Sequence, residues 1–239
     1  GGATRPRCNR ATIAGRGLGG IIMTSPSPSS SGDPHAGQRV VAAGAPLATA
    51  RAAVVMLHGR GATAESILAL GAELDVPDVA FLAPQAGGGA WYPYGFMEPM
   101  ERNEPGITSG LRAIARVLAH IEAAGIPPER AMLLGFSQGA CLALEYCARH
   151  ARRYLGVAGL SGGLIGPDDT PRDYPGSLDG TPVFLGCSDI DGHIPAARVR
   201  QSADVLSRLG GEVTMRLYPG MGHTVNADEM DTVRAMLAV

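Results

Sequence analysis

The sequence contains no lysine: all 20 residues counted as Lys or Arg are arginines. This absence excludes mechanisms that need a lysine amine, such as a phosphate-binding P-loop, a Schiff base or a Ser–Lys dyad. Charge is also nearly balanced, because 22 acidic residues leave a formal net charge of −2. Without a basic stripe or an acidic tail, we expect neither nucleic acid nor a membrane surface as a partner.

Cysteine and long apolar runs are scarce as well. The four cysteines are Cys8, Cys141, Cys147 and Cys187, and they show neither a C-x-x-C pair nor a metal-ligand spacing. This pattern predicts free thiols in a protein of a reducing compartment. No apolar run approaches the roughly 18 residues of a membrane-spanning helix, and residues 18–23 are too short for the core of a signal peptide. We therefore expect a cytoplasmic protein without a membrane span or a metal site.

Apolar residues, in contrast, are abundant enough for one large core. Hydrophobic residues make up 45% of the 239 positions, which fits a single α/β domain. Residues 24–34 form a Ser-, Pro- and Gly-rich tract with little to bury. We therefore expect residues 1–38 to be a disordered N-terminal extension and residues 39–239 to form the domain.

Short apolar runs alternate with segments of helical spacing in this domain. The runs are typical of strands buried on both faces of a parallel sheet, and they lie at residues 52–57, 79–82, 132–136, 155–160, 182–186 and 213–218. Their alternation with helices predicts an α/β fold with a mostly parallel, doubly wound sheet flanked by helices. A (β/α)₈ barrel is the alternative, and about six unevenly spaced strands disfavour it.

One apolar run ends in the motif Gly135-Phe136-Ser137-Gln138-Gly139, and a helical pattern begins at once. This is G-x-S-x-G between a strand and a helix, a turn so tight that side chains at both glycine positions would meet neighbouring backbone. The turn leaves Ser137 at its tip, next to the N–H groups of a helix N-terminus. The motif predicts a nucleophilic serine, although a chain with 34 glycines could contain the bare pattern by chance.

A nucleophilic serine needs a base, and the base needs an acid that orients it. His223 is the preferred base, because it lies in a glycine-rich loop between the last expected strand and the last expected helix. His193 is the rival, but it lies within the loop that supplies the acid. That acid is Asp191 or Asp189, and the pattern Asp-x-x-Ile-Pro before the next helix favours Asp191. The resulting chain order of serine, acid and histidine is that of an α/β-hydrolase.

Two further groups complete the predicted site. An oxyanion needs two backbone N–H donors, for which we expect Gln138, directly after the serine, and Arg60, in the loop after the first predicted strand. His58 is expected to steady that loop. Residues 91–100, called the aromatic segment below, are expected either to wall an apolar acyl pocket or to pack in the core, through Trp91, Tyr92, Tyr94, Phe96 and Met97.

Together these motifs resemble the phospholipase/carboxylesterase family of α/β-hydrolases, which includes acyl-protein thioesterase-like serine esterases. The resemblance covers residues 52–239 and rests on the pieces Leu57-His58-Gly59-Arg60-Gly61, Gly135-Phe136-Ser137-Gln138-Gly139, Ser161-Gly162-Gly163, Asp191-Gly192-His193-Ile194-Pro195 and Gly222-His223. Arg60 stands where the family often has a small or apolar residue, and Gly192 stands where proline is common. Neither departure removes a predicted catalytic residue.

The resemblance implies an α/β-hydrolase fold without a large lid, and a serine hydrolase that needs no metal or cofactor and often forms a homodimer. We expect a carboxylesterase that acts on small-molecule esters with short to medium acyl chains, or on thioesters or lysophospholipids, through Ser137, His223 and Asp191. One alternative is a dienelactone-hydrolase-like enzyme, although these typically have cysteine as the nucleophile. The other is a non-catalytic ligand-binding member of the fold.

Overall fold

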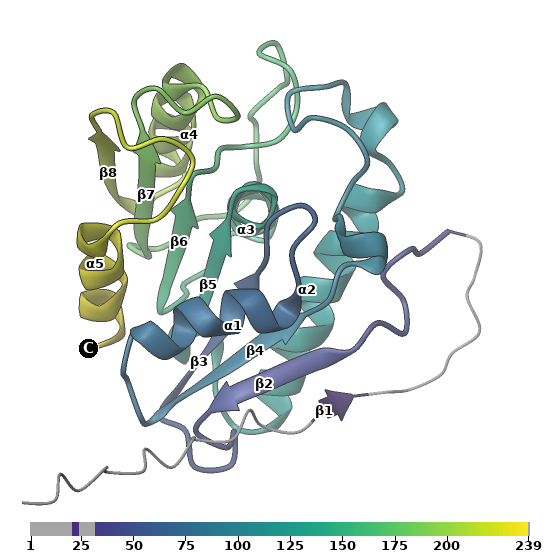
Figure 1. The fold of residues 1–239 in the computed structure, drawn as a ribbon, viewed down its shortest axis with the longest axis vertical. Helices are drawn as coiled ribbons and strands as arrows, with labels where there is room; N and C mark the ends of the chain where they lie inside the picture. The colour runs from purple at the N-terminus through teal and green to yellow at the C-terminus, as the bar shows by residue number, and fades with distance from the viewer. Residues whose placement is uncertain (1–20, 24–31, 239) are drawn as a thin grey trace, which may run out of the picture.

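The computed structural model describes residues 21–23 and 32–238. Their strands form one sheet of eight strands in the order β1-β2-β4-β3-β5-β6-β7-β8 (Figure 1). The strands are β1 (Ile21–Met23), β2 (Val40–Gly44), β3 (Ala52–Leu57), β4 (Val79–Pro84), β5 (Ala131–Phe136), β6 (Gly156–Leu160), β7 (Pro182–Ser188) and β8 (Glu212–Tyr218). β4, β3, β5, β6, β7 and β8 run parallel to one another, whereas β2 pairs antiparallel with β4 and β1 antiparallel with β2.

The mostly parallel sheet confirms the predicted fold class, and all six predicted strands are present. Every residue of β3 and β4 is buried, which explains why these strands are continuous apolar runs rather than alternating patterns. The sheet is open, with β1 and β8 at its two edges, so the barrel alternative is wrong.

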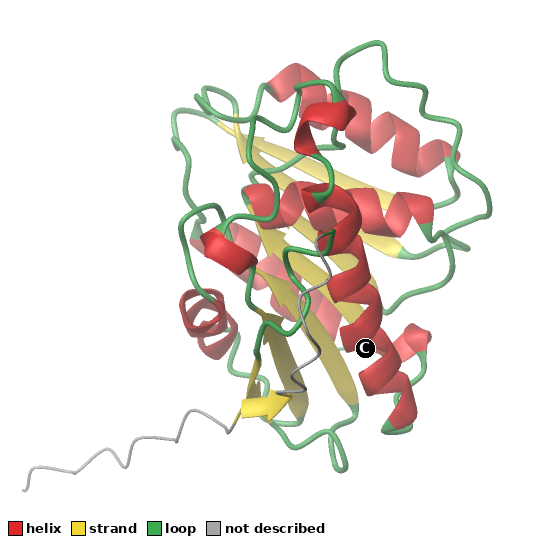
Figure 2. Ribbon diagram, turned by 90° about the vertical axis from the view of Figure 1, so that its right-hand side faces the viewer, coloured by secondary structure: helices red, strands yellow, loops and turns green. Residues whose placement is uncertain are grey.

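Helices cover both faces of the sheet (Figure 2). The described helices are α1 (Ala64–Glu73), α2 (Gly106–Ala123), α3 (Gln138–Arg149), α4 (Ala196–Arg208) and α5 (Ala227–Leu237), with short 3₁₀-helices η1 (Gly87–Gly89), η2 (Met100–Asn103) and η3 (Pro128–Arg130). α1 and α5 pack on one face, which is towards the viewer in Figure 1, and α2, α3 and α4 pack on the other, so the sheet separates two apolar layers. Within residues 21–23 and 32–238, no helix has the length and apolar character needed to cross a lipid bilayer.

β2 is a strand that the sequence did not predict. It pairs with β4 from Val40 opposite Pro84 to Gly44 opposite Ala80. Three of its five residues are alanine or glycine, which have low strand propensity, so the run lacks the β-branched pattern of the other strands. Its pairing with β4, rather than its own composition, therefore makes it a strand.

The described fold begins before the expected boundary at residue 39. His35 is buried, and its two ring nitrogens contact the chain near the aromatic segment: Nε2 lies 2.9 Å from the carbonyl oxygen of Trp91, and Nδ1 accepts from the N–H of Gly87 at 3.0 Å. Residues 32–38 thus differ from the expected disordered extension, because burial and two hydrogen bonds hold the His35 side chain in place. Residues 21–23 of that expected extension form β1, and its remaining residues, 1–20 and 24–31, lie outside the described residues.

The segment between β4 and α2 contains only the short helices η1 and η2, and α2 begins at Gly106. A Cβ at Gly106 would lie 2.7 Å from the carbonyl oxygen of Trp91, so only glycine lets the start of α2 approach the aromatic segment this closely. The segment is therefore held against a helix as well as against the sheet.

Candidate active site

Ser137 lies at the sharp turn between β5 and α3, at the carboxyl edge of the sheet. Its backbone has a φ of 55° and a ψ of −120°, a conformation that side-chain-bearing residues rarely adopt. A Cβ at Gly135 would lie 2.3 Å from the carbonyl oxygen of Gly139, and a Cβ at Gly139 would lie 2.1 Å from that of Leu57. As the motif predicted, neighbouring backbone lies so close to both positions that only glycine fits there.

The structure brings Ser137, His223 and Asp191 together from three loops. Nε2 of His223 lies 2.8 Å from Oγ of Ser137, and Nδ1 of His223 lies 2.7 Å from Oδ2 of Asp191. Asp191 follows β7 and His223 follows β8, so the parallel strands deliver both residues to the edge of the sheet where Ser137 lies. In this arrangement the imidazole can accept the serine proton while the carboxylate holds the other ring nitrogen.

The Asp191 carboxyl group is kept ionised although it is largely buried. Burial raises the pKa of Asp191, but hydrogen bonds from His223 and from the N–H groups of His193 and Ile194 outweigh this effect and hold the pKa below its usual value. The two N–H groups donate to Oδ1 at 2.8 and 3.1 Å, which leaves Oδ2 for His223. A carboxylate in this position can stabilise the imidazolium that forms when His223 takes a proton.

The two alternative residues, Asp189 and His193, occupy supporting positions. Oδ1 of Asp189 accepts a hydrogen bond from the N–H of Gly220 at 2.8 Å, so this exposed side chain braces the loop that carries His223. The His193 ring lies edge-on to the His223 ring, with 4.7 Å between the ring centroids. Among the described contacts no hydrogen bond joins His193 to Ser137, so the geometry favours His223 and Asp191 as the partners of the serine.

The side chains of Gln138 and Arg60 both bind the aromatic segment. Oε1 of the buried Gln138 accepts from the N–H of Trp91, and its Nε2 donates to the carbonyl oxygen of Tyr92, both at 2.8 Å. The Arg60 guanidinium donates to the carbonyl oxygens of residues 93 and 94, at 2.8 and 2.5 Å. The two residues expected to supply the oxyanion donors through their backbone thus anchor one stretch of chain through their side chains.

His58 behaves as the sequence predicted, because it is fully buried and ties the first loop to the chain after β4. Its Nε2 accepts from the N–H of Ala86 at 3.1 Å, and its Nδ1 lies 2.8 Å from the carbonyl oxygen of Gly59. Burial lowers the pKa of His58, which favours the neutral imidazole that can donate at one nitrogen and accept at the other.

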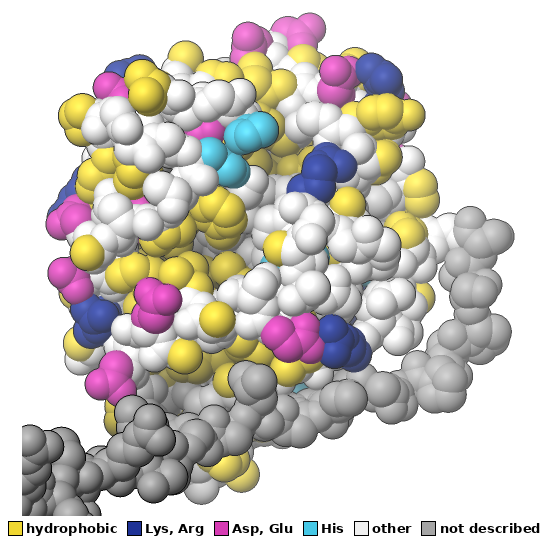
Figure 3. Space-filling view, viewed as in Figure 1, with side chains coloured by type: hydrophobic (Ala, Val, Ile, Leu, Met, Phe, Trp, Pro, Cys, Tyr) yellow, Lys and Arg dark blue, Asp and Glu magenta, His cyan; other side chains and the backbone are white. Residues whose placement is uncertain are grey.

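A cavity of about 320 Å³ opens beside Ser137. Ser137, His223, Gln138 and Arg60 contribute to its wall together with mainly apolar side chains. Figure 3 shows that histidine side chains reach the surface on this face of the molecule, close to apolar ones. A cavity with convergent polar groups at one side and apolar lining at the other is typical of a site for a small organic ligand.

The five predicted pocket residues divide between the cavity and other places. Tyr92 and Phe96 line the cavity, whereas Trp91, Tyr94 and Met97 do not. The Trp91 side chain is fully buried and its indole N–H donates to the carbonyl oxygen of residue 58 at 2.9 Å. Tyr94 is 47% exposed, and Met97 packs against the main apolar cluster. Trp91 and Met97 thus fit the core alternative left open by the sequence, and Tyr94 fits neither, because composition cannot tell which side chains of a long loop turn inward.

Outside the aromatic segment, three residues of the cavity wall were not predicted as pocket residues: Cys141, His193 and Ile194. Their positions in the sequence carry a usable signal. Cys141 follows Ser137 by four residues, which places it one turn along α3 from the serine. His193 and Ile194 follow the acid directly, so the hydrogen bonds from their N–H groups to Asp191 bring their side chains to the cavity.

The described cysteines are buried and free, as expected. Burial raises the pKa of Cys141 and of Cys187 to about 12, so both thiols stay protonated near neutral pH. Cys8 lies outside the described residues. Although Cys141 lines the cavity, its thiol is therefore not activated as a nucleophile.

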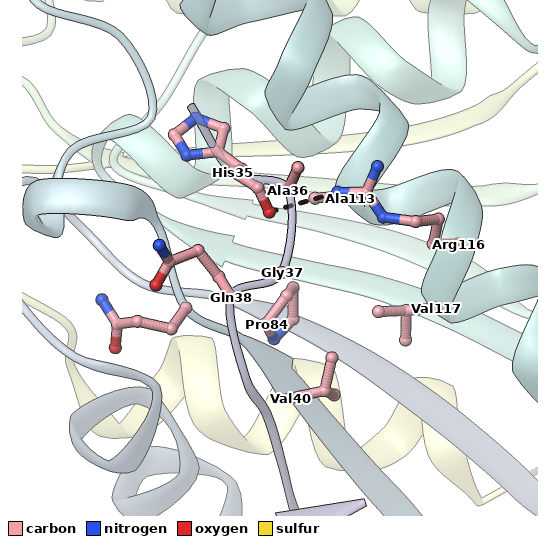
Figure 4. Close-up of a pocket in the computed structure, with 10 residues that line it drawn as sticks. His35, Ala36, Gly37, Gln38, Val40, Pro84, Ala113, Arg116 and Val117 are labelled. Atoms are coloured by element: carbon pink, nitrogen blue, oxygen red, sulfur yellow. Dashed lines mark hydrogen bonds between the residues drawn. The ribbon is translucent and has the colours of Figure 1, made fainter. Parts of the chain in front are cut away.

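A second cavity, of about 240 Å³, lies between α2 and the chain around β2 and β4 (Figure 4). Apolar residues such as Val40, Pro84 and Val117 form part of its wall, and an Arg116 guanidinium nitrogen donates to the carbonyl oxygen of His35 at 3.3 Å. It shares no lining residue with the cavity at Ser137. None of the predicted catalytic or oxyanion residues lines this second cavity.

A buried carboxyl group, that of Glu229, supports the loop that carries His223. Its Oε2 accepts from the N–H of Asn226, whose Oδ1 in turn accepts from the N–H of Glu229, so the pair caps α5 three residues after His223. Oε1 is buried without a partner among the described residues, and a Cβ at Gly186 would lie 2.2 Å from it. Burial raises the pKa of Glu229 to about 7, against the lowering effect of the Asn226 hydrogen bond.

We expect Glu229→Gln to change how stability depends on pH. A carboxyl group whose pKa rises on folding stabilises the folded state fully below its unfolded pKa, and loses that contribution as the pH rises through the folded value. A rise from 4.5 to about 7 makes the wild type lose about 3 kcal/mol over that window. Glutamine can still accept from Asn226 but does not ionise, so the variant should lose no stability there.

Denaturant unfolding of both proteins at pH values from 4.5 to 8 measures this difference. Asp231→Asn, at an exposed acid on the same helix, is the control and should follow the wild-type curve. Parallel pH profiles for Glu229→Gln and the wild type would show that Glu229 ionises normally in the folded protein.

The fold and the site define the class of protein. An open α/β sheet whose central strand ends in a tight serine turn, with the acid and the histidine after later strands, is the arrangement of the serine hydrolases of the α/β-hydrolase fold. A family model described as Phospholipase/Carboxylesterase matches residues 36–239. The chain therefore belongs to the phospholipase/carboxylesterase family.

Comparisons with individual proteins agree with this family assignment. The crystal structure of a phospholipase/carboxylesterase from Dyadobacter fermentans superposes with a TM-score of 0.81 and 42% identity, over 84% of this chain and 97% of that chain. Acyl-protein thioesterase 1 of Saccharomyces cerevisiae is 27% identical over 81% of this chain and 94% of its own. Acyl-protein thioesterase 1 of Gibberella zeae is 35% identical, but the match spans only 47% of this chain and 49% of that protein.

Proposed function

We propose that this chain is a serine carboxylesterase that hydrolyses esters with short to medium acyl chains through Ser137, His223 and Asp191 and a covalent acyl-enzyme. The observation that carries the proposal is a chain of two hydrogen bonds at the cavity wall. Nδ1 of His223 lies 2.7 Å from Oδ2 of Asp191, and Nε2 of His223 lies 2.8 Å from Oγ of Ser137. Each side chain in this line has the partner that its role requires.

In the first half of the reaction, Oγ of Ser137 attacks the ester carbonyl carbon while Nε2 of His223 takes the hydroxyl proton. Asp191 holds Nδ1 of His223 and stabilises the resulting imidazolium. The backbone N–H groups of Gln138 and Arg60 donate to the oxyanion of the tetrahedral intermediate. His223 then gives its proton to the leaving alcohol or thiol, the bond to the leaving group breaks, and the acyl group stays on Ser137.

In the second half, water replaces the serine as the nucleophile. His223 takes a proton from the water as its oxygen attacks the acyl carbonyl carbon, and a second tetrahedral intermediate forms at the same N–H donors. His223 returns the proton to Oγ as the intermediate collapses. The carboxylic acid leaves, and Ser137 is ready for another turnover.

The cavity supports a preference for small acyl groups. Its volume is about 320 Å³ and its wall includes the apolar side chains of Phe96 and Ile194. Thioesters and lysophospholipids share the reacting carbonyl, and relatives named acyl-protein thioesterase make thioesters worth testing. The leaving group therefore has to be varied separately from the acyl group.

Two other functions make different predictions. A dienelactone-hydrolase-like enzyme would open cyclic lactones faster than linear esters, but the cysteine in this cavity has a pKa of about 12 and the residue at the tight turn is a serine. A non-catalytic ligand-binding member of the fold would leave the serine unreactive. The hydrogen bond between Ser137 and His223 favours an activated serine.

Reaction with a fluorophosphonate probe, followed by a panel of p-nitrophenyl esters, tests the proposal. We expect one label per chain on the peptide that contains Ser137, and values of kcat/KM that are highest for short to medium acyl groups. An unlabelled and inactive folded chain would favour the ligand-binding alternative. Faster hydrolysis of a dienelactone than of every linear ester would favour the dienelactone-hydrolase-like alternative.

A further inference from the structure

Arg198, in the first turn of α4, is a buried arginine that has no role in the proposed mechanism. Its side chain is 1% exposed, and Nη2 donates to Oδ1 of Asp168 at 2.6 Å. The Asp168 side chain is 84% exposed, and an ion pair with so exposed a carboxylate contributes little to stability. Because arginine is seldom buried to this degree, its burial requires a further reason.

The other end of the guanidinium binds the loop that follows β6. Nη1 donates to the carbonyl oxygen of Leu164 at 2.8 Å and to that of Gly166 at 2.6 Å. The glycine motif at the start of this loop makes room for the arginine, because a Cβ at Gly163 would lie 2.8 Å from Cγ of Arg198. One side chain of α4 thus fixes residues 164–168, called the β6 loop below.

The β6 loop in turn holds the wall of the active-site cavity. The N–H of Gly166 donates to the carbonyl oxygen of Phe96 at 2.7 Å, and Phe96 lines the cavity beside Ser137. The Arg198 guanidinium also lies over the Phe96 ring, 5.7 Å from its centroid, although Arg198 itself does not line the cavity. Arg198 therefore acts on this wall residue by two routes, through Gly166 and through the ring.

Arg198 also belongs to the element that carries a second wall residue. Ile194 lines the cavity directly before α4, and the N–H of Arg198 donates to the carbonyl oxygen of Pro195 at 2.9 Å in the first turn of that helix. Ile194 and Phe96 are far apart in the sequence. The hydrogen bonds of Arg198 join the segments that carry these two apolar side chains.

We propose that Arg198 is a positioning residue that limits the length of the acyl chain the cavity accepts, because it holds Phe96 in the wall. The inference rests on the proposed esterase function and names the residue that sets its substrate range. A chain too long for the cavity can bind only if a wall residue moves. Movement of Phe96 with the β6 loop would break hydrogen bonds to a buried guanidinium, which are among the stronger hydrogen bonds in proteins.

A pair of p-nitrophenyl esters, the octanoate and the butyrate, tests the proposal. The readout is the ratio of kcat/KM for the octanoate to kcat/KM for the butyrate. Arg198→Met keeps a long side chain but removes every donor, so the wall should yield and the ratio should rise about tenfold. A residue needed only for stability would lower kcat/KM for both esters alike and leave the ratio unchanged.

Three further variants sharpen the experiment. Arg200→Met makes the same change at an exposed position of α4 and should keep the wild-type ratio. Asp168→Asn removes the carboxylate but leaves both bonds from Nη1, so it should keep the ratio as well. Arg198→Lys retains the charge on a shorter side chain without the planar fork, and it should raise the ratio about threefold.

The outcomes separate this inference from the function on which it rests. A wild type that hydrolyses neither ester and does not react with the fluorophosphonate probe contradicts the proposed function itself. A wild type that hydrolyses the butyrate, with a folded Arg198→Met whose ratio stays within about twofold of wild type, overturns the role of Arg198 alone. If Arg198→Met does not fold, the same criterion applies to Arg198→Lys. A ratio raised by the Arg198 variants and kept by Arg200→Met and Asp168→Asn supports the proposal.

Discussion

Ser137→Ala is expected to lower kcat on a short p-nitrophenyl ester by roughly 10⁴-fold or more. The reason is that the proposed mechanism has no other nucleophile: the one thiol in the cavity, Cys141, has a pKa of about 12. Alanine has the same backbone preferences as serine at the strained φ of 55°, so the turn should keep its shape. Steady-state kinetics and circular dichroism of both proteins measure the two expectations.

Ser161→Ala is the matched control for that experiment. Ser161 also follows a parallel strand, β6, and also has a positive φ, of 51°, but its Oγ is buried and makes no hydrogen bond to His223. Its loss should change kcat far less than the loss of Ser137. If Ser137→Ala kept the parent rate, the proposed nucleophile would be wrong.

Asp191→Asn is expected to lower kcat by about 10⁴-fold with little change in structure. The N–H groups of His193 and Ile194 can still bind an amide oxygen in place of Oδ1. The amide nitrogen would then face Nδ1 of His223 as a donor and would favour the tautomer that carries its proton on Nε2. That tautomer cannot take the proton of Ser137, so the chemical step slows while binding is retained.

Asp189→Asn is the control that also separates the two acids left open by the sequence. Its amide oxygen can still accept from the N–H of Gly220, so we expect only a small change in kcat. Comparison of kcat and KM for the two variants decides between the acids. A larger loss for Asp189→Asn than for Asp191→Asn would reverse the assignment.

Features that depend on close-range sterics or on burial could be predicted from the sequence. The tight turn at Gly135 and Gly139 was predictable because no other residue fits between their backbone neighbours. The buried strands were predictable because parallel strands covered on both faces are continuous apolar runs. The order of Ser137, Asp191 and His223 followed from their places after three of the parallel strands, β5, β7 and β8. The distances between them depend on the packing of three loops, which the sequence does not reveal.

Features that depend on distant neighbours were missed or misjudged. β2 is a strand because β4 pairs with it, and His35 is ordered because Trp91 and Gly87 offer it partners. Within the aromatic segment, Trp91 and Tyr92 are adjacent, yet the first contacts the loop after β3 and the second lines the cavity. No pattern in the local sequence distinguishes the two positions.

The double attachment of the aromatic segment limits how this enzyme could be redesigned. The side chains of Gln138 and Arg60 hold residues 91–94, while Tyr92 and Phe96 of the same segment line the cavity. Mutations that remodel this segment to admit a longer acyl chain would also shift Gln138 and Arg60, the residues proposed to stabilise the oxyanion. We therefore expect mutations in this segment to change substrate range and turnover rate together, and a library that varies residues 91–96 would have to vary positions 60 and 138 with them.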